Sequence, residues 1–129
     1  MTPARAPVVA TLVTGASAQA REAAIAAALG AGAVTSTAII LEGLAPGSSP
    51  LDILHDDPQP GMQLARIAPG CLCCTGNLVL RVTLNRLLRQ RPERLFIGVA
   101  RSEHLDQLRS WLQSEPYDQL LRLTPDLQA

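Results

Sequence analysis

The segment Val8–Gly15, with the sequence VVATLVTG, is the strongest indication of the fold class of this chain. Its first six residues are apolar or β-branched without polar alternation, which is typical of a strand buried on both faces. An Ala-rich segment at 18–29 comes next and is followed by Gly30, which predicts a helix with a glycine stop signal. The order of strand, glycine turn and helix predicts a layered α/β protein.

The same alternation continues along the rest of the chain. Further buried strands are predicted at 37–41, 64–68, 94–99 and 120–123, and helices at 77–90 and 102–112. Residues 43–61 are rich in proline and glycine, so they are predicted to form a loop in which only 51–54 make a helical turn. The pattern predicts one domain, residues 1–129, with a mainly parallel sheet and helices on both faces.

Composition excludes several classes of function. The 129-residue chain carries 11 basic and 11 acidic residues, so its net charge gives no indication that it binds nucleic acid or an anionic membrane. Residues 23–41 are uncharged, but they are Ala-rich and interrupted by Gly30 and Gly32, which favours a soluble helix and strand over a membrane span. Clustered cysteines without a secretory signal predict a cytoplasmic protein.

All three cysteines of the chain lie between Gly70 and Gly76, as Cys71, Cys73 and Cys74. Three thiols this close in sequence can reach one ion, and Zn²⁺ or another thiophilic metal is the expected partner. A disulfide is disfavoured because near neighbours cannot easily reach its geometry and the number of cysteines is odd. Inert buried thiols are the remaining alternative.

Three thiolates leave a fourth position in a tetrahedral zinc site. Glu42 is the preferred candidate, because its strand should end on the side of the sheet where the cysteine loop lies. His55 and His104 are alternatives, although a lone histidine is more often a surface or capping residue.

A second group of residues is basic. Between 81 and 94 the chain has five arginines, which could meet RNA or an acidic partner: Arg81, Arg86, Arg89, Arg91 and Arg94. Because the net charge is near zero and no aromatic residues are interleaved with them, a solvated helix face is expected instead.

The glycine turn, the strand ending in Glu42 and the Gly70-Cys71-Leu72-Cys73-Cys74-Thr75 motif together resemble the CobW-like family of P-loop GTPases, which handle zinc, cobalt and other metals. The resemblance spans about residues 8–123. It implies a three-layer P-loop NTPase-like fold, with Cys71, Cys73 and Cys74 as metal ligands.

The nucleotide-binding part of the family pattern is altered. A P-loop reads G-x-x-x-x-G-K-[ST], and its lysine and hydroxyl contact the phosphates and Mg²⁺. Here Gly15 is retained, but Ala20, Arg21 and Glu22 occupy the positions of the second glycine, the lysine and the hydroxyl, and the chain contains no lysine at all. Gly15 and Arg21 are therefore expected to be remnants of a phosphate site, and GTP binding is not expected.

A second nucleotide element falls on residues 97–102. Gly98 replaces the glutamate of the family and Arg101 replaces its glycine, and the sequence stops before a guanine-recognition segment. The expected protein is a truncated, non-catalytic pseudo-GTPase that binds zinc or another thiophilic metal and takes part in metal homeostasis, sensing or delivery, with a metal-recipient protein as an expected partner. The alternatives are a divergent GTP-hydrolysing metallochaperone and a non-catalytic interaction module that forms homodimers or docks on a full-length relative.

Overall fold

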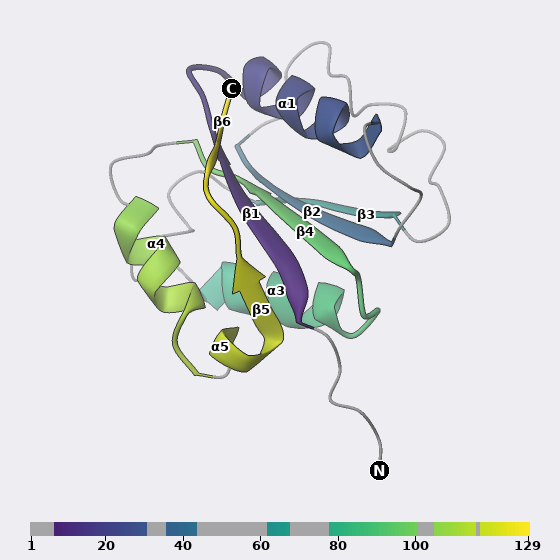
Figure 1. Cartoon of the computed structure of the whole chain (residues 1–129), viewed down its shortest axis with the longest axis vertical. Coiled ribbons are helices and arrows are strands. Elements are labelled where there is room, and N and C mark those ends of the chain that lie inside the picture. Colours follow the sequence, from purple (N-terminus) through teal and green to yellow (C-terminus); the bar gives the residue numbers. More distant parts are fainter. Residues whose placement is uncertain (1–6, 31–35, 44–61, 68–77, 101–104, 116) are drawn as a thin grey trace.

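A computed structural model describes residues 7–30, 36–43, 62–67, 78–100, 105–115 and 117–129 (Figure 1). The strands in these ranges are β1 (Val8–Thr14), β2 (Thr37–Glu42), β3 (Met62–Ile67), β4 (Arg94–Gly98), β5 (Leu121–Leu123) and β6 (Leu127–Gln128). The helices are α1 (Ala18–Gly30), α3 (Leu78–Leu88), α4 (Leu105–Leu112) and α5 (Tyr117–Leu120). No helix in this part of the chain is long and apolar enough to cross a membrane.

The described strands form one sheet in which every pairing is parallel. Their order is β3-β2-β4-β1-β5, and the short β6 continues beside β1 beyond β5. In the centre, Val9 of β1 is in register with Arg94 of β4, which is also in register with Thr37 of β2. The carboxyl ends of β1, β2 and β4 therefore meet at one edge of the sheet, where ligands of parallel α/β proteins bind.

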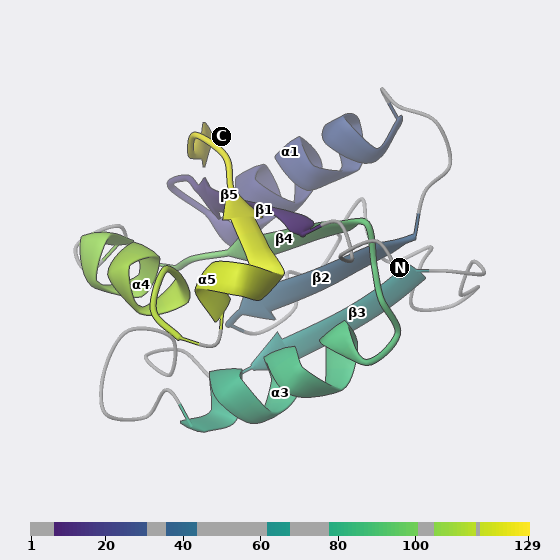
Figure 2. The ribbon, with the colours of Figure 1, turned by 60° about the horizontal axis from the view of Figure 1, so that its bottom comes forward.

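Helices cover both faces of the sheet (Figure 2). α1 packs on one face through Ile25, against the strand residues Val13, Ile39 and Phe96. On the other face α3, α4 and α5 bury Leu80, Leu84, Leu87, Leu108, Leu112 and Tyr117 against the opposite side chains of the same strands. β2, nearly all of β4 and the C-terminal half of β1 are buried on both faces, so these runs show no polar alternation.

The predicted α/β fold with a mainly parallel sheet and helices on both faces is confirmed. The predicted strands near 8–13, 37–41, 64–68, 94–99 and 120–123 correspond to β1 to β5, with ends that differ by at most two residues within the described ranges. The structure adds α5 and β6, which were not predicted. The predicted helical turn at 51–54 lies outside the described residues.

The ends of α1 and α3 follow from individual residues. Ser17 is the N-cap of α1, because its Oγ accepts a hydrogen bond from the backbone N–H of Ala20 at 3.0 Å. After α3 the chain turns through Arg91, which has a φ of 55° and donates its backbone N–H to the Leu88 carbonyl at 3.0 Å. An arginine here holds a left-handed conformation that glycine adopts at lower cost.

Candidate functional site

The turn between β1 and α1 is the position of the altered P-loop, and its own side chains fill it. Arg21 is only 7% exposed, and its Nη1 donates a hydrogen bond to the carbonyl of Gly15 at 2.9 Å. A P-loop lysine reaches outward to the phosphates. Here the cation in that position binds the turn that would form the cradle, so it stabilises the turn directly.

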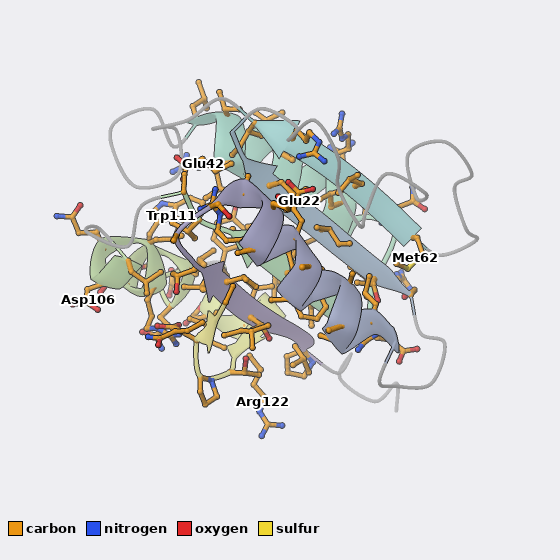
Figure 3. The ribbon with its side chains drawn as sticks, turned by 90° about the horizontal axis from the view of Figure 1, so that it is seen from above. Glu22, Glu42, Met62, Asp106, Trp111 and Arg122 are labelled. Atoms are coloured by element: carbon orange, nitrogen blue, oxygen red, sulfur yellow. The ribbon has the colours of Figure 1, made fainter. Side chains whose placement is uncertain are left out.

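Glu22, which stands where a P-loop hydroxyl would hold Mg²⁺, is also directed into the protein (Figure 3). The residue is 2% exposed, and both of its carboxylate oxygens accept hydrogen bonds from the Arg66 guanidinium of β3 at 3.0 Å. A bidentate pair of this kind fixes both side chains and compensates the buried charge. The pair connects α1 to the outer strand of the sheet.

The C-terminal residues lie against the same turn. The backbone N–H of Ala129 donates to the Thr14 carbonyl at 2.7 Å. A Cβ atom added to Gly15 would lie 2.8 Å from the Cβ of Ala129 and 3.1 Å from the Cγ of Arg21. Both separations are shorter than ordinary van der Waals contact, so Gly15 is required here for close packing against protein atoms.

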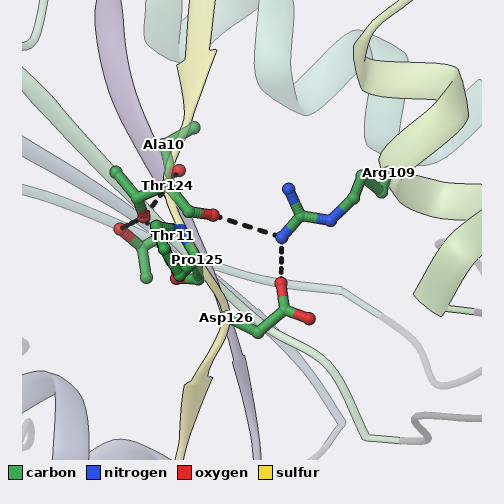
Figure 4. A network of polar contacts seen from close by, with 6 residues as sticks. All are labelled: Ala10, Thr11, Arg109, Thr124, Pro125 and Asp126. Atoms are coloured by element: carbon green, nitrogen blue, oxygen red, sulfur yellow. Dashed lines mark hydrogen bonds and ion pairs between the residues drawn. The ribbon is translucent and has the colours of Figure 1, made fainter.

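A polar network holds the C-terminal segment in this place (Figure 4). Arg109 of α4 forms an ion pair with Asp126 and donates to the Thr124 carbonyl at 3.2 Å. The Thr124 hydroxyl lies 2.7 Å from that of Thr11, and the Thr124 backbone N–H donates to the Ala10 carbonyl at 2.9 Å. These contacts connect α4, β1 and the segment that leads to β6.

Gly98 ends β4 at the position where the resemblance would place a glutamate. A Cβ added to Gly98 would lie 3.0 Å from the Cδ2 of Leu41, a side chain that is almost completely buried. Leu41 therefore occupies the space into which a longer side chain would extend. A larger residue at this position would require the end of the Leu41 side chain to shift.

Glu42 ends β2 at the same edge of the sheet and is buried. Its Oε1 accepts a hydrogen bond from the backbone N–H of Ala100 at 2.8 Å. Glu42 is in register with Ile67 of β3, and the backbone N–H of Gly43 donates to the Ile67 carbonyl at 2.9 Å. Ile67 is the last described residue before the cysteine motif, so the chain leaves the sheet toward Cys71 from a position beside Glu42.

The metal site itself cannot be assembled from the described residues. Cys71, Cys73, Cys74, His55, His104 and Arg101 lie outside them. Within the part of the chain that the structure describes, no group of three or more His, Cys, Asp or Glu side chains could hold a metal ion.

Two features of this site were not predicted. The first is Arg66, the partner of Glu22. A charged residue in the otherwise apolar predicted strand 64–68 could have indicated a buried ion pair. The second is the C-terminal segment that covers Gly15; no local sequence motif predicts this contact.

Comparison with known proteins supports part of the resemblance. The chain is similar to the zinc chaperone YeiR of Escherichia coli (strain K12), with 37% identity over 68 residues, which are 52% of this chain and 21% of YeiR. The chain thus spans about a fifth of the length of this relative. No family model and no solved structure matches it. The chain therefore has a distant, partial similarity to a CobW-like zinc chaperone, and its parallel α/β sheet is consistent with a P-loop-like fold.

Proposed function

We propose that this chain is a CobW-like pseudo-GTPase that binds zinc through Cys71, Cys73 and Cys74 and takes part in zinc delivery in the cytoplasm. Glu42 is the fourth ligand in this proposal. The observation that supports it is the register of β2 and β3, which pairs Glu42 with Ile67, the last described residue before the cysteine motif.

The chemistry of these four residues suits zinc. Three thiolates and one carboxylate give the tetrahedral, soft-ligand environment in which Zn²⁺ is usually held. The hydrogen bond from the Ala100 backbone to Glu42 Oε1 orients the carboxylate, as outer contacts do for metal ligands in general. The similarity to YeiR, a zinc chaperone, favours zinc over other thiophilic metals.

Three contacts support the absence of GTP hydrolysis. The Arg21 guanidinium binds Gly15, the Glu22 carboxylate binds Arg66, and Leu41 packs where Gly98 would need a carboxylate. Each of these contacts uses a group or a space that a GTPase needs for phosphate, Mg²⁺ or the attacking water. A divergent GTPase remains the second candidate function, favoured by the preserved order of strand, glycine turn and helix.

Metal analysis of the purified protein tests the zinc proposal. Under reducing conditions it should contain about one Zn²⁺ per chain, or bind it with release of protons from the thiols. Cys73→Ser should weaken binding sharply and Glu42→Gln should weaken it less. Glu115→Gln, at an exposed carboxylate three residues after the end of α4, serves as the control. Unchanged zinc affinity in Cys73→Ser would reject the site.

Calorimetric titration with GTP and Mg²⁺ separates the two candidate functions. We expect no binding, and micromolar binding with turnover would establish the divergent GTPase. Sedimentation with and without zinc tests the remaining alternative, a homodimer governed by the thiols.

A further inference from the structure

The solvent-facing side of α3 has an unusual number of exposed apolar side chains. Leu78 is 62% exposed, Val82 61% and Val79 44%. In the described residues, four of the five large apolar side chains that are exposed lie on α3 or beside its C-terminal end, since Leu120 lines a hollow with Asn85, Leu88 and Arg89. Scattered single apolar residues are normal on a surface, whereas a cluster marks a site of interaction.

These side chains share one face of the helix. Leu78, Val82, Asn85, Arg86 and Arg89 follow helical spacing, and all are exposed. The opposite side is the buried side of α3, with Leu80, Leu84 and Leu87 in the core. We name Leu78, Val79, Val82, Asn85, Arg86 and Arg89 the outer α3 face; it is apolar in its N-terminal half and basic in its C-terminal half.

The basic half has no acidic residues within it to balance its charge. The chain has no acidic residue between Asp57 and Glu93, although it is neutral as a whole. Arg86, Arg89 and Arg91 are all exposed. Among the described residues, the nearest exposed carboxylates along the sequence are Glu93, two residues after Arg91, and Asp118, two residues before Leu120. Three exposed arginines outnumber them, so this surface is expected to attract an acidic partner rather than a neutral one.

A hollow at the C-terminal end of α3 extends the face. It has a volume of about 520 Å³ and is lined by Asn85, Leu88, Arg89, Arg91 and Leu120. Arg91 lines it while holding a φ of 55°, where glycine would be less strained. Arg89 and Arg91 thus both line the hollow, and guanidinium groups suit carboxylates.

We propose that the outer α3 face and this hollow dock an acidic amphipathic segment of a partner protein. Aliphatic side chains of that segment cover Leu78 and Val82, and its carboxylates reach Arg86, Arg89 and Arg91. The docking does not depend on the proposed zinc binding. It also revises the expectation that the arginines form an ordinary solvated face.

Two other occupants fit the surface less well. RNA-binding surfaces present aromatic side chains on which bases stack, and the exposed apolar residues of the outer α3 face are all aliphatic. A second copy of the chain would present the same outer α3 face, which has no carboxylate to pair with Arg86 and Arg89.

Fluorescence anisotropy with the whole chain tests the proposal. The probe is a fluorescein-labelled synthetic helix of about four turns, with leucines on one face of its first half and glutamates on the same face of its second half. A matched peptide has lysine in place of each glutamate, and a third has the acidic sequence scrambled. We expect the acidic amphipathic peptide to bind at least about tenfold more tightly than either control, and more weakly as salt is raised.

Variants of surface residues locate the binding. Val82→Asp, and separately Arg86→Glu with Arg89→Glu, should each weaken binding by about tenfold or more. Arg122→Glu, a charge reversal at an exposed arginine of β5, should leave it unchanged. Far-ultraviolet circular dichroism and thermal unfolding establish that each variant is folded, and a zinc chelator in every sample keeps the test independent of the metal.

Several results would overturn the proposal. They are no measurable binding of the acidic peptide, equal binding of the lysine peptide, and equal losses in Arg122→Glu and the α3 variants. Tighter binding of single-stranded RNA to the same residues would assign the face to nucleic acid, and self-association that Val82→Asp abolishes would assign it to a second copy of the chain.

Discussion

Arg21 and Glu22 show how two residues convert a phosphate-binding turn into part of the structure. Both are charged and both are buried, because each has a specific protein partner, Gly15 for Arg21 and Arg66 for Glu22. The sequence showed only that Glu22 replaces the hydroxyl with which a P-loop holds Mg²⁺. It could not predict the ion pair, since Arg66 lies on a strand far along the chain and only the order of the sheet brings it beneath α1.

The first prediction concerns this ion pair. Glu22→Ala should destabilise the protein by roughly 2 kcal/mol, because it removes both hydrogen bonds to a guanidinium that is three-quarters shielded from water. Urea unfolding followed by circular dichroism measures the loss. Replacing Glu22 and Arg66 together by leucine and methionine should cost less than Glu22→Ala alone. If the stability lost in the double variant equals the sum of the losses in the two matching single variants, Glu22 and Arg66 are not coupled.

Tyr117 gives a prediction about pH. Burial raises the pKa of this phenol above its ordinary value of 10.0, against the opposing effects of the Arg81 charge and of its hydrogen bond to Asn85. Above pH 10 the unfolded tyrosine ionises before the folded one, so the folded state holds more protons and stability falls as pH rises. Tyr117→Phe should lose about 1 kcal/mol at neutral pH, with the hydrogen bond to Asn85 Oδ1.

The same variant should show a weaker decline in stability between pH 10 and 11 than the parent chain. No lysine or second tyrosine titrates in this pH range, because the chain has no lysine and a single tyrosine. Thermal unfolding of both proteins across this range provides the measurement, and parallel declines would mean that Tyr117 does not titrate differently in the folded state.

At the scale of elements, the end of α3 gives the next prediction. Arg91→Gly should stabilise the chain by about 0.5 kcal/mol, because relief of the left-handed conformation outweighs the greater freedom of glycine in the unfolded state. The same substitution should weaken binding of the acidic peptide. Arg91→Ala, which keeps the strained φ and removes the guanidinium, is the matched control: it should weaken binding without the gain in stability.

The β1–α1 turn supplies the fourth prediction. Ala20→Gly, Arg21→Lys and Glu22→Thr together restore the P-loop pattern. We expect weak phosphate binding at best and no useful GTP hydrolysis, because Gly98 provides no carboxylate and the C-terminal segment still covers Gly15. A phosphate-release assay with GTP and Mg²⁺ measures this, with the parent chain as control. Hydrolysis at a rate typical of an intact GTPase would show that the active site lies elsewhere.

Elements with strong periodicity could be predicted from the sequence, and weak ones could not. Buried strands such as β2 and β4 have continuous apolar runs, and α3 has leucines at helical spacing, so pattern alone identifies them. α5 has four residues and β6 has two, which is too short for any period. β6 forms because Arg109 and Thr124 hold the segment before it, a tertiary effect with no local signal.

At the scale of the whole molecule, the site could be predicted only in outline. Glu42 and the β1–α1 turn were expected at the carboxyl edge of a parallel sheet, and the register of β1, β2 and β4 places them there. How the turn is filled could not be predicted, because Ala129 of the C-terminal segment covers Gly15 together with Arg21 of α1, and the partner of Glu22 comes from β3. The ligand set of Cys71, Cys73, Cys74 and Glu42 remains a prediction.

The order of the sheet also bears on how the chain folds during its synthesis. Among the described strands β1 leaves the ribosome before the others, yet its described neighbours, β4, β5 and β6, all follow residue 93, and β4 must insert between β1 and β2. Until then β1 is an apolar strand with both edges unpaired, a state that favours aggregation or capture by a chaperone. The chain therefore gains its central pairing late, and a ribosome stalled before residue 94 would present a nascent chain without a complete sheet.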